Sequence, residues 1–215
     1  MKPCLFTILL VLCGVPLPAQ APASAPVAKA HASEIGFTYS LPSDWEVVDT
    51  QSTLPAVRQK VENEATSADE RKGAACAQIA LTARHGDPAS IVVVVVLPFD
   101  CFGQTMTGKD LPDFASGASE GLRKSFTLAD PLHAEYKLGA HSMWAERAKG
   151  ALKDHPDVLY TVETVCSVLK KGAVCWMAMA KDDAALDTFE RGAVSLDGEA
   201  PAALVPASAF VNKPS

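Results

Sequence analysis

Apolar and polar positions along the chain form blocks, and each block predicts an element of secondary structure. Residues 35–41 alternate between apolar and polar side chains, which predicts a strand that ends at Pro42. Residues 45–48 then resume an extended pattern. The segment 54–65 carries an apolar residue at every fourth position and predicts a helix, whereas the polar segment 66–73 predicts a loop.

The most apolar block of the folded region is residues 91–97, which are aliphatic at every position. We expect this segment to pair with a strand over residues 75–83, across a turn at 85–90. A strand with one face in water would alternate between apolar and polar residues, so this one is predicted to be buried on both faces. Each side of its sheet must then be covered by other elements.

Two further helices are predicted by apolar stripes and capping residues. Asp110 can cap the first, whose apolar stripe comprises Leu111, Phe114, Ala115, Ala118, Leu122 and Phe126. Asp182 or Asp183 can cap the second, which ends near Gly198. Its inward-facing residues are expected to be Leu186, Phe189 and Ala193.

Two β-hairpins are predicted between these helices. Residues 132–138 and 142–148 flank a Gly-Ala turn, and residues 158–169 and 173–180 flank a Lys-Lys-Gly turn. Gly172 in the second turn is expected to adopt a positive φ. Since strands occur in hairpins and do not alternate with helices, the sheet should be mostly antiparallel. Helices on both faces of the aliphatic strand would make an α+β fold, specifically a three-layer α/β/α sandwich.

The beginning of the chain has the order of a secretory signal peptide. Lys2 precedes an apolar run at residues 5–12, and small residues suited to cleavage after Ala21 or Ala23 follow. We therefore assign residues 1–23 to a signal peptide. The run is shorter than the roughly 20 apolar residues of a membrane-spanning helix, so we expect no transmembrane anchor in the mature chain.

The remaining chain divides into one domain and two flanking segments. Residues 24–33 are rich in Ala and Pro and predict a flexible leader. Residues 34–198 have the length of a single domain. Residues 199–215 again contain many Ala and Pro residues and predict a disordered tail.

The charge balance excludes some classes of partner. The formal net charge of the chain is −6, and no basic stripe runs along it. Nucleic-acid binding depends on clustered Lys and Arg, so we expect no nucleic-acid partner. The same balance argues against docking on anionic lipid.

Four cysteines remain after removal of the signal peptide: Cys76, Cys101, Cys166 and Cys175. In an exported chain they predict two disulfides, with three possible connectivities. Partners on antiparallel strands lie at equal distances from the turn, which favours Cys76–Cys101 and Cys166–Cys175. Redox chemistry and metal binding are the alternatives, but a Cys-x-x-Cys pair is absent and the spacing is unlike that of zinc ligands.

The candidates for chemistry are few. His133 and His141 flank the first hairpin turn, and with Glu135 or Glu146 they would form a metal-binding or enzyme site. Against this stands the simpler interpretation of two histidines exposed near a turn. A Gly-x-Ser-x-Gly motif and a phosphate-binding loop are both absent. The sequence assigns no catalytic, cofactor-binding or metal-binding residue.

A small-ligand carrier is a further alternative. Trp144, Trp176 and Met177 lie on neighbouring predicted strands and would line its cavity. The simpler interpretation is that these side chains pack in the core.

Residues 36–45 (GFTYSLPSDW) resemble the opening of the Mog1/PsbP/DcrB-like superfamily, in which an aromatic strand enters a Leu/Tyr-Pro-x-x-Trp corner. The order of the later elements is also similar to that family. The resemblance implies an α/β/α sandwich and a small non-enzymatic module that acts as an accessory subunit or binds a partner. No binding residue of the family maps onto this chain by a motif.

Together these features predict an exported, disulfide-stabilised protein of the periplasm or cell envelope. We expect it to be a non-catalytic accessory or partner-binding domain without a cofactor. The alternatives are the histidine site and the ligand carrier described above.

Overall fold

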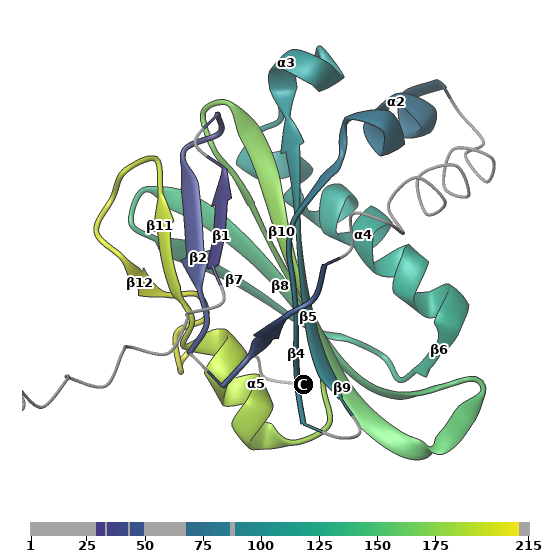
Figure 1. The fold of residues 1–215 in the computed structure, drawn as a ribbon. Coiled ribbons are helices and arrows are strands. Elements are labelled where there is room, and N and C mark those ends of the chain that lie inside the picture. Colours follow the sequence, from purple (N-terminus) through teal and green to yellow (C-terminus); the bar gives the residue numbers. More distant parts are fainter. Residues whose placement is uncertain (1–28, 33, 43, 50–67, 87–88, 211–215) are drawn as a thin grey trace, which may run out of the picture.

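The computed structural model describes residues 29–32, 34–42, 44–49, 68–86 and 89–210. The signal peptide assigned to residues 1–23 and the helix expected at 54–65 lie outside the described residues. The described part is an α+β fold in which every strand pairing is antiparallel (Figure 1).

An eight-stranded sheet forms the centre of the structure. Its strand order is β3 (Glu46–Val47), β4 (Gln78–His85), β5 (Ser90–Pro98), β10 (Gly172–Ala180), β9 (His155–Val168), β8 (His141–Leu152) and β6 (Phe126–Leu128). The remaining strand, β7 (Leu132–Leu138), pairs with β8 beside β6. Both expected hairpins are present, as β7–β8 and β9–β10.

The two faces of this sheet are covered differently (Figure 1). A four-stranded sheet and helix α5 (Asp183–Glu190) lie on the face that we call inner; its strands are β1 (Lys29–Ala32), β2 (Phe37–Ser40), β11 (Ala193–Leu196) and β12 (Ala202–Ala203). The outer face carries helix α4 (Leu111–Ser125). Three short helices complete the part of the fold that the structure describes: α2 (Ala68–Cys76), α3 (Phe99–Phe102) and the 3-10 turn η1 (Gly108–Asp110). Among the described helices, none is long and apolar enough to cross a membrane.

The main core lies between the two sheets, around Trp176 of β10. This side chain is completely buried, and the rings of Phe37 and Tyr39 meet it edge to face at 5.5 and 6.2 Å. Such aromatic pairs contribute about 0.5–1.5 kcal/mol each beyond the area that they bury. Phe189 of α5 extends the cluster, with its ring 6.4 Å from that of Tyr39.

The aliphatic strand β5 is buried unequally on its two faces. Val92, Val94 and Val96 are buried against the small sheet, whereas Ile91, Val93 and Val95 on the outer face are only half-buried. The sequence predicts helices on both faces of β5, and the structure does not have this arrangement. The antiparallel α+β fold agrees with the sequence prediction, but the α/β/α sandwich is not confirmed because a second sheet covers most of the inner face.

Several local expectations differ from the structure near α2. Residues 68–76 form a helix where a loop had been expected up to 73, and strand β4 begins only at Gln78. The segment is rich in Ala, Glu, Arg and Lys, which favour a helix, and Cys76 at the end of α2 is joined to Cys101 in α3. Cys76 and Cys101 were predicted to be opposite each other on antiparallel strands, whereas in the structure they lie on helices beyond the paired ends of β4 and β5.

Gly172 does not have the expected positive φ. Its lack of a side chain is instead required by packing, because a Cβ atom there would lie 2.5 Å from Cγ2 of Ile35. Asp110 does not cap α4 either. Its carboxylate accepts hydrogen bonds from the backbone N and the Oγ1 of Thr107, at 2.7 and 2.9 Å, and so closes the η1 turn. These bonds lower the pKa of Asp110.

The C-terminal part contains a strand where a helix had been expected. Asp182 caps α5 as predicted, but α5 ends at Glu190, and Ala193 lies exposed on β11. Gly198 has a positive φ in the turn after β11 and does not cap a helix.

Both flanking segments are ordered in part. The leader expected over residues 24–33 contains strand β1, which pairs with β2. In the tail expected over residues 199–215, β12 pairs with β11, and Leu204 and Val205 are buried. The small sheet is thus completed by the segments that composition alone had placed outside the domain.

We predict that Val94→Asp prevents folding, because Val94 is completely buried and an aspartate there would be a charge without a partner. The measurement is thermal unfolding followed by circular dichroism. Val47→Asp is the matched control, since Val47 is 56% exposed on β3. A soluble Val94→Asp protein with a cooperative transition would show that the inner face of β5 is not buried.

Candidate functional site

His133 and His141 do not form a common site. In the β7–β8 hairpin His133 is opposite Glu146 and His141 is opposite Leu138. Side chains alternate along a strand, so His133 lies on the outer face of the sheet and His141 on the inner face. The hypothesis of one metal-binding or enzyme site that uses both histidines is therefore wrong.

His141 contributes to the contacts that hold the segment after β11. Its Nε2 atom lies 3.7 Å from carboxylate oxygens of both Asp197 and Glu199. The same carboxylates accept backbone N–H groups of Lys170 and Ala140, at the turns of the two hairpins. Each carboxylate thus links a hairpin turn to the segment after β11, so His141 and these two carboxylates have a structural role.

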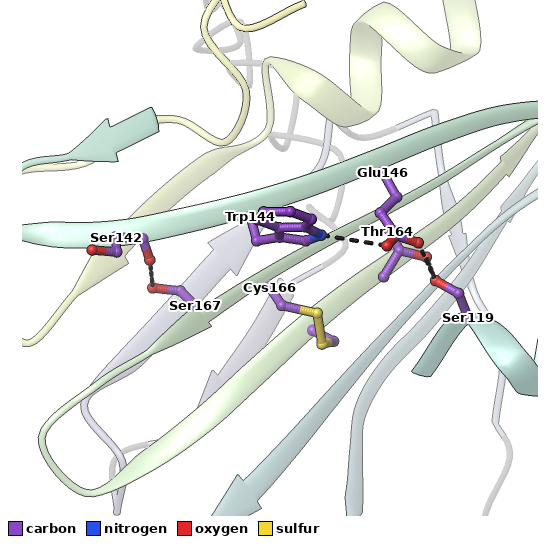
Figure 2. The surroundings of a disulfide bond; sticks show 8 residues. Ser119, Ser142, Trp144, Glu146, Thr164, Cys166 and Ser167 are labelled. Atoms are coloured by element: carbon purple, nitrogen blue, oxygen red, sulfur yellow. Dashed lines mark hydrogen bonds between the residues drawn. A yellow bond between two sulfur atoms is a disulfide. The ribbon is translucent and has the colours of Figure 1, made fainter. Parts of the chain in front are cut away.

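A polar cluster lies on the outer face between α4 and the sheet (Figure 2). Ser119 of α4 donates a hydrogen bond to Oε2 of Glu146 at 3.1 Å, and its Oγ lies 3.3 Å from that of Thr164. The indole Nε1 of Trp144 donates to Oε1 of Glu146 at 3.4 Å. The ring of His133 lies 5.5 Å from that of Trp144. The hydroxyls, the carboxylate and the indole N–H are thus bonded within the cluster, whereas Nδ1 of His133 has no hydrogen-bond partner among the described residues.

This cluster does not have the order of a hydrolase triad. In a triad the histidine contacts the serine and the acid orients the histidine. Here Glu146 lies between Ser119 and His133, and Nδ1 of His133 is 3.6 Å from the carboxylate, too far for a hydrogen bond. Ser119 is also buried on the side of α4 that faces the sheet. The arrangement supports the side chain of Trp144 and offers no activated nucleophile.

The second disulfide lies next to this cluster. Cys166 and Cys175 are opposite each other on β9 and β10, and their bond is completely buried under Leu111 and Ala115 of α4. Trp144 packs at the edge of the same contact. The structure thus contains the two disulfides that hairpin geometry favoured, Cys76–Cys101 and Cys166–Cys175. A burial of this kind is typical of a structural bond.

A surface pocket opens beside Trp144, with a volume of about 410 Å³. The turn at η1 forms one side, and the β7–β8 hairpin forms the floor and the other side. Its lining residues are Gly108, Lys109, Leu111, Pro112, Glu135, Tyr136, Lys137, Ser142, Met143 and Trp144. The absence of a side chain at Gly108 keeps the turn close to the floor, because a Cβ atom there would lie 3.0 Å from Oγ of Ser142.

The pocket combines an aromatic ring with charged groups of both signs. Lys109, Glu135 and Lys137 are exposed around it, and Nζ of Lys137 donates to Oγ of Ser142 at 2.7 Å. Trp144 is half-buried, whereas the other two tryptophans of the chain, Trp45 and Trp176, are buried. The pocket therefore holds the one tryptophan that a ligand or partner can reach.

The hypothesis of a ligand carrier whose cavity is lined by Trp144, Trp176 and Met177 is also wrong. Trp176 of β10 is opposite Val165 of β9, which is opposite Ala145 of β8, and these three residues face the inner core. Trp144 and Met177 are their neighbours along the strands and face outward. The three side chains expected to line one cavity are thus on opposite sides of the sheet.

A buried ionic cluster lies on the inner face and was not predicted. Glu163 of β9 is completely buried, and its Oε2 accepts a hydrogen bond from Nε of Arg147 at 2.6 Å. Arg147 also donates to Glu190 of α5, and its guanidinium lies 4.0 Å over the ring of Phe210. The available signal was a single acidic residue within the apolar segment 158–169.

Burial dominates the electrostatics of this cluster. It raises the pKa of Glu163 to about 7, although Arg147 acts in the opposite direction, and it also raises the pKa of Glu190. The pKa of Tyr39 is raised as well by burial, and its hydroxyl donates to the carbonyl of Phe189 at 3.0 Å. The two carboxylates hold Arg147, which in turn contacts Phe210 of the C-terminal segment.

No family model matches the chain, and no curated protein matches it. Among solved structures, the chain is similar to the solution structure of cyanobacterial PsbP (CyanoP) from Synechocystis sp. PCC 6803. The TM-score is 0.43 at 11% sequence identity, over 78% of this chain and 86% of that chain.

We predict that the stability of the protein falls as pH rises from about 4.5 to about 7. The pKa of Glu163 is raised from 4.5 to about 7 in the folded protein, so the folded state binds this proton more tightly than the unfolded state does. The contribution of protonated Glu163 to the free energy of unfolding is fully present below pH 4.5 and is lost as pH rises through 7. The effect of this one group is at most on the order of 3 kcal/mol. The measurement is urea unfolding across this pH range.

Glu163→Gln removes this titration and should flatten the decline of stability with pH. Glu135→Gln is the matched control, because Glu135 is exposed on β7. An unchanged pH dependence in Glu163→Gln would show that Glu163 ionises normally in the folded protein.

Proposed function

We propose that the protein is an exported, non-catalytic domain that binds a protein partner of the periplasm or cell envelope through the pocket beside Trp144. The observation that carries this proposal is the environment of Trp144. Its ring is accessible from the pocket, while the polar groups behind it are bonded to one another. Such a site can recognise a side chain, and because its serine is buried and donates to Glu146 it offers no activated nucleophile.

The pocket's lining suggests the chemistry of the partner. An apolar side chain would pack against Trp144, Pro112 and Leu111. Lys109 and Lys137 provide two cations against the single carboxylate of Glu135, in a protein whose net charge is negative. We therefore expect a partner segment with an apolar side chain next to an acidic residue.

Two further observations support export and an accessory role. Two disulfides favour an oxidising compartment, in agreement with the signal peptide expected at residues 1–23. The resemblance of residues 36–45 to the Mog1/PsbP/DcrB-like superfamily implies a domain of the same non-enzymatic class.

The proposal is tested by site-specific photo-crosslinking in the native host. A photoreactive residue in place of Lys109 should capture a protein partner, and Trp144→Ala in the same chain should reduce the captured amount about tenfold or more. The control is the photoreactive residue in place of Lys171, an exposed residue in the β9–β10 turn. Equal capture from the two positions, or capture that is unaffected by Trp144→Ala, would exclude the pocket as the binding site.

A further inference from the structure

Strand β7 leaves one side of its backbone available for pairing. Among the described strands it pairs only with β8, in a regular register that ends at the two-residue turn Gly139-Ala140. In such a hairpin the pairs Leu138–His141, Tyr136–Met143 and Ala134–Ala145 share hydrogen bonds. The alternate residues His133, Glu135 and Lys137 therefore turn their N–H and C=O groups away from β8.

The side chains on this edge fit a second copy of the same strand. When β7 pairs with itself antiparallel about a two-fold axis at Tyr136, Glu135 of each copy is opposite Lys137 of the other. Both side chains are exposed on the outer face, so both can form the pair. Opposite charges across antiparallel strands are stabilising, and like charges are destabilising.

The neighbouring registers are disfavoured by the same charges. An axis at Glu135 places the two Glu135 carboxylates opposite each other, and an axis at Lys137 does the same for the two ammonium groups. Of these three axes, only the one at Tyr136 combines the free backbone groups with opposite charges at both symmetric positions. On the inner face this register places Ala134 opposite Leu138 of the other copy, and Tyr136 opposite its own equivalent, so that row is apolar or aromatic throughout.

We propose that two copies of the chain associate through β7 in this register and form one continuous antiparallel sheet. The two-fold axis is perpendicular to the sheet, so both pockets open on the same face beside the axis. Glu135 and Lys137 line the pocket and also form the contact. Lys137 has three donors and can keep its bond to Ser142 while it pairs with Glu135 of the second copy. This association does not depend on the proposed partner, because it requires only the protein itself.

Charge reversal tests the register by sedimentation equilibrium of the disulfide-bonded protein over a range of concentrations. Glu135→Lys and Lys137→Glu should each raise the dimer dissociation constant about tenfold or more, because each places like charges opposite each other at two symmetric positions. The double variant restores both pairs and should dimerise like the wild type. A mixture of the two single variants should form a heterodimer more tightly than either variant dimerises alone.

Lys171→Glu is the matched control for Lys137→Glu, because it makes the same change of charge at an exposed turn on another hairpin. Thermal unfolding of each variant should be unchanged, since Glu135 and Lys137 are exposed. Concentration-dependent protection of the Glu135 and Lys137 amides from hydrogen exchange would support pairing along β7. A wild-type protein that remains monomeric at all concentrations, or single variants that dimerise like the wild type, would overturn the proposal. If the protein stays monomeric and the same amides become protected when an unrelated extended peptide is added, the edge binds a different partner and the proposal is overturned.

Discussion

The packing of the small sheet onto the large one around Trp176 is the constraint on which the rest of the structure depends. It buries one face of β5, β9 and β10 and so fixes the direction of every side chain on these strands and on β8. Close approach at Gly172 of β10 reflects this contact, because a Cβ atom there would lie 2.5 Å from Cγ2 of Ile35. Because Trp176 faces inward, Trp144 and the buried disulfide of β9 and β10 must face outward.

Features that depend on local sequence were predicted well. The β7–β8 and β9–β10 hairpins follow from their short turns, and the β9–β10 turn also places Cys166 opposite Cys175. The second sheet was missed because its strands are two to four residues long and join residues 29–40 with residues 193–203. Pairing over such a distance leaves no periodic signal in either segment. Because the second sheet was missed, helices were expected to cover the inner face of β5, where the structure has a sheet.

The candidate site shows the same division between local and long-range information. His133 and His141 are close in sequence, but the alternation of side chains along the hairpin sends them to opposite faces. The pocket arises where the η1 turn meets β7 and β8, and the cluster of Arg147, Glu163 and Glu190 joins two strands and a helix. Neither could be assembled from spacing alone. The one signal that could have pointed to this cluster is a single acid, Glu163, within the apolar segment 158–169.

The outer face therefore combines an accessible tryptophan, a rim of charged residues and a free strand edge, while the inner face is committed to packing. The most direct test of this division is the NMR relaxation of the three indole N–H groups in the presence of a soluble paramagnetic agent. We expect strong broadening of the Trp144 signal and little change for Trp45 and Trp176, which are buried. Protection of Trp144 together with broadening of Trp176 would contradict the assignment of the two faces, and with it the pocket as a binding site.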